Sequence, residues 1–242
     1  MKVLTIDLEN SPNVADVWSL FKTTVSLSQL RESSRVICFA AKWLDDPEVL
    51  FYSEFKDGHE AMVQEAFNLL DEADVLVHYN GTRFDVPKLN WEIVKQIGSP
   101  PAPFQQVDLL KVMKKKFGAT SKKLDYVAQE LGLAGKTQHE GHALWVKCME
   151  GDEDAWARME EYNKNDVVIT EGVYKKFLPW IDGHPHRGLY SESEEACPNC
   201  NSSDLERRGF AFTSVSKFQR YRCKDCGRWS RSGRRVGSVE KR

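Results

Sequence analysis

Val3-Leu4-Thr5-Ile6-Asp7-Leu8-Glu9 is the stretch that decides the fold, because an apolar run ends there in two acids. The run before Asp7 is typical of a buried strand, and strand side chains alternate between faces, so Asp7 and Glu9 point the same way. Two carboxylates side by side repel each other unless a cation lies between them, and Mg²⁺ and Mn²⁺ prefer such oxygen ligands. The stretch therefore predicts bound metal ions, which together with several carboxylates indicate phosphoryl-transfer chemistry.

The segments after this strand alternate between strand and helix patterns. Runs rich in Val, Ile, Phe, Trp and Tyr predict further strands, over 16–21, 36–44, 48–53 and 75–79. Apolar residues at helical spacing predict helices, over 59–72, 86–97, 108–116, 122–131 and 152–178. Asp108 and Ser121 are expected as helix N-caps. This alternation predicts an α/β fold.

Two further acids occur in a consistent structural context. Asp85 follows the expected strand 75–79 by a short loop, and Asp166 lies on the long helix, one turn after Tyr162. Catalytic residues of α/β folds gather at the carboxyl ends of strands. Each acid alone fits an ordinary solvated or capping charge, and Tyr162 alone fits a half-buried helix aromatic. Their ordered combination points to one metal site.

These motifs together resemble the DEDD superfamily of 3′→5′ exonucleases, which have a ribonuclease H-like fold. The matching segments are Asp7-Leu8-Glu9, Asn80-Gly81-Thr82-Arg83-Phe84-Asp85 and Tyr162-Asn163-Lys164-Asn165-Asp166. Tyrosine at the start of the third motif is similar to the tyrosine subgroup, which includes the proofreading domains of DNA polymerases. The resemblance covers about residues 1–180. It implies a mixed β-sheet flanked by helices, in a stand-alone enzyme for which a phage origin is plausible.

The resemblance also implies roles for single residues. The ligands of two Mg²⁺ or Mn²⁺ ions would be Asp7, Glu9, Asp85 and Asp166. The Tyr162 hydroxyl would orient the attacking water, because an ordinary tyrosine pKa near 10 makes a poor general base. The residues expected to contact the terminal nucleotide are Leu8, Asn80 and Phe84.

The expected reaction is hydrolysis of DNA from single-stranded or frayed 3′ ends, releasing nucleoside monophosphates. An RNA exonuclease fits the same motifs. A nucleic-acid-binding protein with an inactive nuclease body and a ribonuclease H-type endonuclease are further alternatives. Replication, repair, recombination and salvage of host DNA all remain open as pathways, and so does the oligomeric state.

Four of the six cysteines form two Cys-x-x-Cys pairs, with 22 residues between the pairs. This spacing is typical of a structural zinc site, with Cys197, Cys200, Cys223 and Cys226 as ligands of one Zn²⁺. The pairs resemble a zinc ribbon, in which each pair lies in a turn and a β-hairpin connects them. Cys38 is expected in the core, and Cys148 has no evident partner in the sequence.

Charge is distributed unevenly along the chain. Residues 1–186 contain 21 basic and 29 acidic side chains, whereas residues 187–242 contain 13 and 7. A basic C-terminal part suggests a polyanionic partner, so the zinc module is expected to bind DNA, with protein docking as the alternative. The expected organisation is an exonuclease domain over 1–180, a linker over 181–196, a zinc ribbon over 197–230 and a disordered basic tail over 231–242.

From the bulk composition we do not expect a membrane protein. The chain is 41% apolar and 29% charged, with a mean hydropathy of −0.52. No apolar run approaches the roughly 20 residues that span a bilayer, and the N-terminus lacks the pattern of a secretory signal. A cytoplasmic protein is therefore expected, in a bacterial or phage-infected cell.

Overall fold

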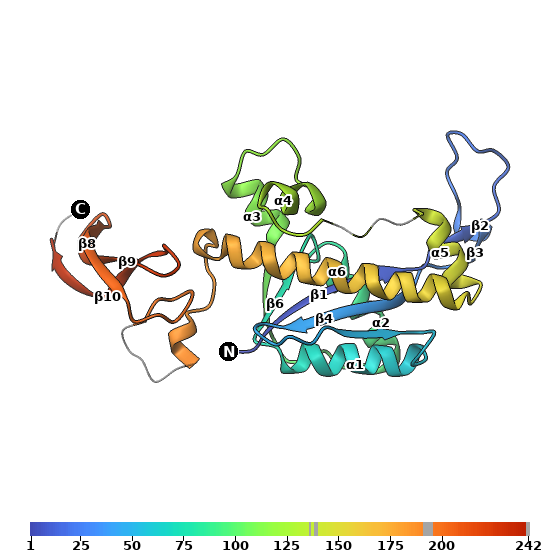
Figure 1. Ribbon diagram of the computed structural model, residues 1–242, viewed down its shortest axis with the longest axis horizontal. Helices are drawn as coiled ribbons and strands as arrows, with labels where there is room; N and C mark the ends of the chain where they lie inside the picture. The colour runs from blue at the N-terminus through green and yellow to red at the C-terminus, as the bar shows by residue number, and fades with distance from the viewer. Residues whose placement is uncertain (136, 138–139, 191–195, 241–242) are drawn as a thin grey trace. The chain divides into compact units, whose positions relative to one another are not determined.

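The chain forms two compact units in the computed structural model, which describes residues 1–135, 137, 140–190 and 196–240 (Figure 1). One unit spans Lys2–Tyr174, and the other comprises Lys175–Arg242 together with Met1. Among the described residues, no helix is both long enough and apolar enough to cross a membrane.

The first unit is built on a five-stranded mixed sheet in the order β5-β4-β1-β6-β7. Its strands are β1 (Val3–Asn10), β4 (Val36–Trp43), β5 (Leu50–Ser53), β6 (Val75–His78) and β7 (Gln105–Asp108). β1 and β4 pair antiparallel, as do β4 and β5, whereas β6 runs parallel to β1 and to β7. β1 is central, but its pairing with β6 ends at Thr5, so its acidic end is paired with β4 and extends beyond the end of β6.

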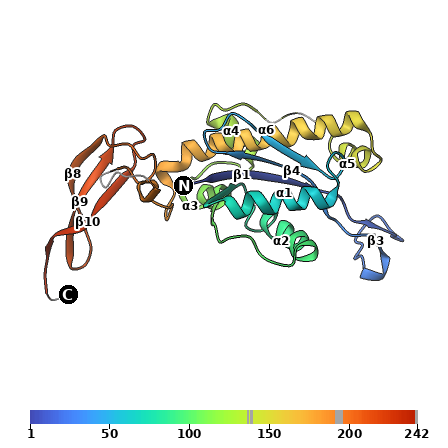
Figure 2. The same ribbon diagram turned by 90° about the horizontal axis from the view of Figure 1, so that it is seen from below.

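Helices cover both faces of this sheet (Figure 2). One face carries α1 (His59–Glu72) and α2 (Asp85–Gln96), and the other carries α5 (His142–Met149) and α6 (Glu153–Phe177). Two shorter helices, α3 (Leu109–Lys116) and α4 (Leu124–Glu130), follow β7. The α/β fold class, with a mixed sheet flanked by helices, is thereby confirmed.

The alternation of side chains along β1 separates core from site. Leu4, Ile6 and Leu8 are buried in the apolar cluster shared with α1 and α2. Asp7 lies on the opposite face, where it meets α6. The register of β1 against β4 is continuous as far as Glu9, so Glu9 shares the face of Asp7.

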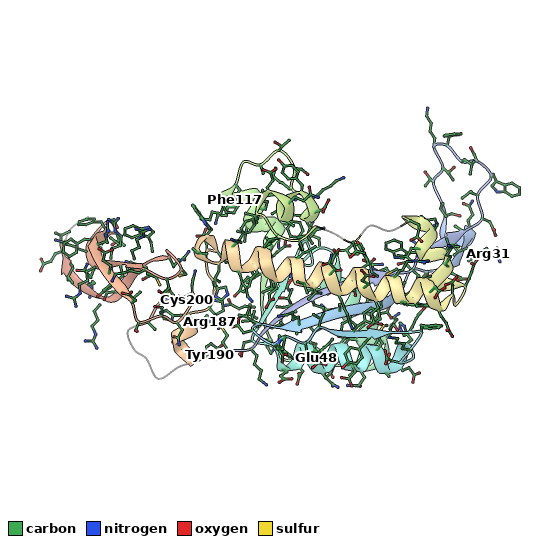
Figure 3. All side chains as sticks on the ribbon, in the orientation of Figure 1. Arg31, Glu48, Phe117, Arg187, Tyr190 and Cys200 are labelled. Carbon is green, nitrogen blue, oxygen red and sulfur yellow. The ribbon has the colours of Figure 1, made fainter. Side chains whose placement is uncertain are left out.

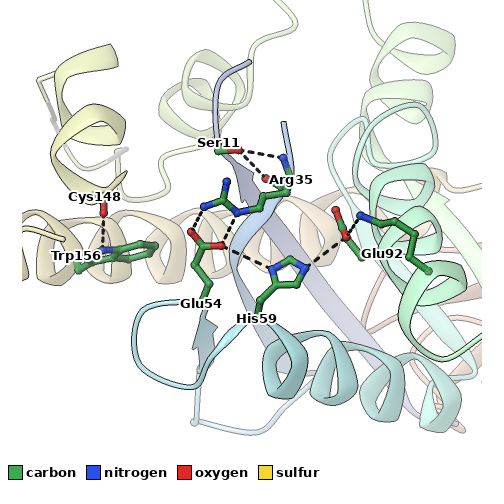
Figure 4. A network of polar contacts seen from close by, with 8 residues as sticks. Ser11, Arg35, Glu54, His59, Glu92, Cys148 and Trp156 are labelled. Atoms are coloured by element: carbon green, nitrogen blue, oxygen red, sulfur yellow. Dashed lines mark hydrogen bonds and ion pairs between the residues drawn. The ribbon is translucent and has the colours of Figure 1, made fainter. Parts of the chain in front are cut away.

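A polar network fixes α1 and α2 beside the sheet (Figure 4). Arg35 makes a two-pronged ion pair with Glu54, at 2.8 and 2.9 Å. His59 lies between two acids, with Nδ1 3.7 Å from Glu54 and Nε2 3.4 Å from the buried Glu92. The interaction with Glu54 is the largest cause that raises the pKa of His59. Burial lowers this pKa, and the charge of Glu92 raises it further.

On the other face, a buried ion pair joins the sheet to α6. The Lys42 ammonium of β4 lies 2.9 Å from the Glu171 carboxylate, and both side chains are less than a tenth exposed. Both groups have lost most of their hydration, so each depends on the other for compensation. The pair therefore ties the long helix to the strand next to β1.

The prediction of a strand over 16–21 is wrong. The structure instead has two short strands, β2 (Val14–Ala15) and β3 (Leu30–Glu32), and the segment between them extends away from the sheet (Figure 3). Trp18 is 100% exposed, and Leu20 and Phe21 are nearly so. The strand-like composition of this segment finds no sheet edge to pair with, and composition alone does not supply one.

Other differences concern short elements with weak sequence signals. β7 was not expected, because its residues are mostly polar and it pairs only at the sheet edge. The sequence predicts no bounds for α5, although Cys148 lies in a helix-like stretch. Ser121 is not a helix N-cap: its hydroxyl accepts the Lys123 N–H in a turn, and α4 begins at Leu124. Asp108 does cap its helix, accepting the N–H groups of Leu110 and Lys111.

The second unit contains a three-stranded antiparallel sheet in the order β10-β9-β8. Its strands are β8 (Leu205–Phe212), β9 (Ser216–Cys223) and β10 (Trp229–Ser238). The expectation of a disordered tail over 231–242 is corrected here, because β10 continues to Ser238; residues 241–242 lie outside the described part. The basic composition suggested disorder, but the backbone pairs with β9, and the arginines project from an exposed strand.

Candidate active site and metal centre

The Asp7 carboxylate is held by the long helix. Asn163 Nδ2 of α6 donates to Asp7 Oδ2 at 2.8 Å and to the Asp7 backbone carbonyl at 3.3 Å. Glu9 lies two residues further on the same strand face, opposite Cys38 of β4. The end of β1 thus presents two carboxylates toward α6, as the sequence predicts.

Asp85 reaches the same end of β1 from the first turn of α2. Its carboxylate accepts the backbone N–H of Leu8, the residue between the two acids of β1. Burial is the main cause that raises the Asp85 pKa to about 6; the hydrogen bonds from its own N–H and from Leu8 lower it, and the charge of Asp108 raises it. An acid that is 5% exposed and partly protonated near neutrality gains from a nearby cation.

The loop that carries Asp85 is shaped by contacts at the end of β6. Gly81 N donates to His78 Nδ1 at 3.0 Å, and a Cβ atom on Gly81 would lie 2.4 Å from His78 Cγ. Asn80 adopts a left-handed conformation, with φ +73°, and its N–H donates to Asp108 Oδ1 at 3.0 Å. Only glycine fits at position 81, and Asp108 serves both this loop and its own helix.

The third motif lies on one face of α6. Tyr162 and Asp166 are separated by four residues and are both buried, with Asp166 2% exposed. The pKa of Tyr162 is raised strongly, first by burial and then by the charges of Asp166, Glu9 and Asp7 and a hydrogen bond with Asp166. The hydroxyl therefore remains protonated at neutral pH and lies within the electrostatic influence of three of the four predicted ligands.

Asn163 is a site residue that sequence reasoning missed. It is fully buried one position after Tyr162, and its Oδ1 atom accepts no hydrogen bond from the described residues. A buried amide oxygen without a donor is costly. The signal was its place inside the third motif, on the helix face of Asp166, but the sequence does not show that this face meets Asp7.

The remaining predicted contacts differ in their exposure. Phe84 precedes α2 with its side chain 47% exposed, so its ring is accessible to a ligand. Asn80 is half-buried. The Leu8 side chain belongs to the apolar core, which limits any contact that Leu8 makes with a ligand to its backbone.

The four acids thus come from three separate parts of the chain to the end of β1. They are not packed as tightly as ligands of one ion: within the described residues, the cysteine cluster is the group of three or more His, Cys, Asp or Glu whose ligand atoms all lie within 4.8 Å of one another. Carboxylate donors, one of them with a raised pKa, nevertheless fit hard divalent cations such as Mg²⁺ or Mn²⁺.

The cysteine cluster consists of Cys197, Cys200, Cys223 and Cys226. Its thiols are not joined by disulfides, and the sulfur–sulfur distances across the pairs are 3.5 Å and 3.6 Å. Four sulfurs about 2.3 Å from a tetrahedral zinc would be about 3.8 Å apart. The donor set and its spacing therefore fit zinc.

Two similar turns bring these cysteines together. In each turn, the residue four positions after the first cysteine donates its N–H to that cysteine's carbonyl: Asn201 to Cys197 at 3.0 Å and Gly227 to Cys223 at 3.1 Å. Both donors have positive φ, +62° and +75°. The hairpin of β8 and β9 connects the two turns, which agrees with the predicted ribbon.

Comparison with known proteins places the first unit in a superfamily. Residues 27–178, more than half of the chain, match a family described as RNase_H superfamily. This match includes Asp85, Tyr162 and Asp166 and begins after β1. No curated protein matches the chain.

Among solved structures, RNase D of Trypanosoma brucei is similar with 16% sequence identity and a TM-score of 0.45. The similarity covers 71% of this chain and 56% of that chain, so this chain spans little more than half the length of that protein. Since the family match covers more than half of the chain, this chain belongs to the RNase H superfamily.

Proposed function

We propose that this protein is a metal-dependent 3′→5′ exonuclease that hydrolyses DNA at single-stranded or frayed 3′ ends and releases nucleoside monophosphates. The observation that carries the proposal is the convergence of Asp7, Glu9, Asp85 and Asp166 on the end of β1, beside the Tyr162 hydroxyl. Membership of the RNase H superfamily supports a nuclease. The order of the three motifs supports the exonuclease direction.

The four carboxylates would hold two Mg²⁺ or Mn²⁺ ions, which when bound supply an activated water and stabilise the leaving 3′ oxygen. Tyr162 stays a neutral phenol at neutral pH, because its pKa is raised strongly. Its hydroxyl donates to Asp166, and the hydroxyl oxygen orients the attacking water by accepting a hydrogen bond from it. Asn163 keeps the Asp7 carboxylate in one orientation.

Phe84 positions the terminal nucleotide. Its half-exposed ring stands directly before Asp85 in the chain, so a base stacked on it lies near the carboxylates. Stacking of this kind is worth about 1–3 kcal/mol per base and tolerates any base. This suits an enzyme that removes nucleotides one after another, and an unpaired end offers its base more readily than a duplex.

The cysteine cluster is proposed as a structural site for one Zn²⁺ that holds the two turns of the second unit together. Metal analysis of the purified protein should give about one zinc per chain, and Cys197→Ser should remove it. Zinc retained by that variant would contradict the ligand role of Cys197.

The exonuclease proposal is tested with 3′-labelled and 5′-labelled oligonucleotides of DNA and RNA, given Mg²⁺, Mn²⁺ or neither. Stepwise release of the 3′ label that requires added metal is expected. Internal cuts as the first products would show an endonuclease instead. Comparing the DNA and RNA oligonucleotides shows which sugar the enzyme prefers. Faster cleavage of RNA would identify RNA, and not DNA, as the substrate.

Two variants on the same helix separate chemistry from folding. Asp166→Asn removes a proposed ligand and should abolish cleavage, whereas Asp154→Asn removes an exposed carboxylate in the first turn of α6 and should leave cleavage unchanged. Circular dichroism checks that both variants fold. An Asp166→Asn protein that is folded and cleaves normally would remove Asp166 from the mechanism.

A further inference from the structure

The three-stranded sheet of the second unit has two faces of different chemistry. Side chains alternate along β9, and residues paired across strands share a face. The pairs Arg222–Trp229, Arg220–Arg231 and Phe218–Arg235 therefore bring β9 and β10 side chains to one side. We name this side the arginine face, and it consists of Phe218, Arg220, Arg222, Trp229, Arg231 and Arg235.

Cations and rings are layered on the arginine face. The Arg231 guanidinium lies 4.0 Å from the Phe218 ring centroid, and the Arg220 guanidinium lies 4.9 Å from that of Trp229. Trp229 remains 46% exposed, and the four arginines are exposed. The guanidinium groups of Arg220 and Arg231 are planar, and each has an aromatic ring on one side. The other side of each plane can accept a second planar group.

Little negative charge offsets these arginines. Glu206 of β8, paired with Arg222, is the acidic residue within the three strands. Its carboxylate already forms an ion pair with Arg208 at 2.9 Å. Four arginines on one sheet face therefore retain their charge for a partner.

The opposite face differs in both charge and packing. Its paired basic residues are Arg207 and Lys217, which alternate onto this side with Gln219 and Tyr221. Arg208 and Arg234 lie at irregularities of the strand register and are assigned to neither face. The Lys217 ammonium lies 3.8 Å from the Phe210 ring centroid and partly covers that ring. Among the paired residues, the arginine face therefore has four arginines and the opposite face has two basic residues.

We propose that the arginine face binds single-stranded nucleic acid, with phosphates at the arginines and unpaired bases stacked on Trp229 and on the guanidinium planes. The inference deepens the proposed function and rests on it for the nature of the polyanion. A single strand fits better than a duplex because duplex bases are stacked on one another and cannot stack on protein rings. An acidic protein would satisfy the charges but would leave the stacking planes unused.

The test compares variants of the full chain, purified with zinc. Arg222→Gln with Arg235→Gln removes two charges from the arginine face, whereas Arg207→Gln with Lys217→Gln removes two from the opposite face. Affinity for a 5′-labelled 20-nucleotide oligothymidine is measured by fluorescence anisotropy at several salt concentrations, without Mg²⁺ or Mn²⁺ so that the strand is not cleaved. Equal zinc content shows that both proteins fold.

Each phosphate contact contributes about 0.7 to the slope of log K against log salt for a single strand. The arginine-face variant should therefore lose about 1.4 from that slope, while the opposite-face variant keeps the wild-type slope. Trp229→Ala should weaken binding to the single strand by about 5- to 150-fold and should change binding to a hairpin duplex much less.

Equal losses in the two charge variants, or unchanged binding in both, would overturn the inference, and unchanged binding would leave an acidic protein as the partner. A Trp229→Ala protein that binds the single strand normally would exclude stacking. The outcomes separate the two proposals. Cleavage of 3′ ends without a role for the arginine face refutes this inference alone, whereas binding through the face without cleavage refutes the exonuclease alone.

Discussion

Asn163→Ala tests whether the Asp7 carboxylate must be held in place for metal binding. The substitution removes the donor that lies 2.8 Å from Asp7 Oδ2 and 3.3 Å from the Asp7 carbonyl. Asp7 remains chemically intact but loses the amide that orients it. The variant should therefore bind metal more weakly without losing the ability to cleave.

The size of the effect follows from these contacts. A hydrogen bond to a charged group contributes about 1.5–3 kcal/mol. The buried Oδ1 atom of Asn163, which accepts no hydrogen bond from the described residues, disappears at the same time and offsets part of that loss. We expect a free-energy loss near the lower end, about 1.5 kcal/mol, which for a protein of this size lowers Tm by about 3–6 °C. Loss of a group that orients a ligand typically weakens metal affinity by about 10- to 100-fold.

The assay is release of the 3′ label as a function of Mg²⁺ concentration. The half-saturating concentration should rise by about 10- to 100-fold, and high Mg²⁺ should restore most of the rate. Asn165→Ala is the matched control, because the Asn165 amide donates to Gly135 O and Thr137 Oγ1, outside the carboxylate site. A variant at Asn163 with the wild-type Mg²⁺ requirement, or one whose loss is equalled by the control, would refute the reasoning.

Three further predictions concern stability. Gly81→Ala should cost about 1–3 kcal/mol in unfolding free energy, because the new Cβ atom would clash with the His78 ring. Gly118→Ala, which has open space around its Cβ position, should cost no such energy when both variants are measured by urea denaturation. Lys42→Met should cost about 3–5 kcal/mol by removing the ammonium from beside the buried Glu171 carboxylate, and adding Glu171→Leu should recover most of that loss; a double variant no better than the single would contradict this. Because its flanking glutamates raise the pKa of His59 above 6.5, its charge stabilises the fold fully below that pH, and the contribution is lost as the pH rises through the raised value. Unfolding free energies should therefore fall across that window in the wild type and stay flatter in His59→Gln, and parallel curves would disprove the coupling.

The sequence predicts best what depends on strong local patterns. The apolar run of β1, the alternation of Asp7 and Glu9, and the capping of α3 by Asp108 all follow from periodicity and side-chain chemistry within a few residues. The cysteine spacing likewise predicts a cluster, because two short pairs can meet only where the chain folds back on itself. These features required no knowledge of long-range contacts.

The rest depends on contacts between distant parts of the chain. Asn163 matters because β1 lies under α6, and no local pattern shows that pairing. β7 exists because β6 offers it an edge, although its own residues are polar. Conversely, the segment around Trp18 has the composition of a strand and finds no partner, and β10 has the composition of a disordered tail and finds one.

The exposed segment between β2 and β3 has a practical consequence for protein engineering. Its base is closed by two hydrogen bonds, from Asp16 N to Gln29 O at 3.0 Å and from Gln29 Nε2 to Asp16 O at 2.9 Å. The residues beyond that clamp, including the fully exposed Trp18, contribute apolar surface to the solvent and none to the buried core. Replacing 17–28 with a short glycine-containing turn would remove this exposed apolar surface. Such a truncation is therefore a rational starting point for crystallisation.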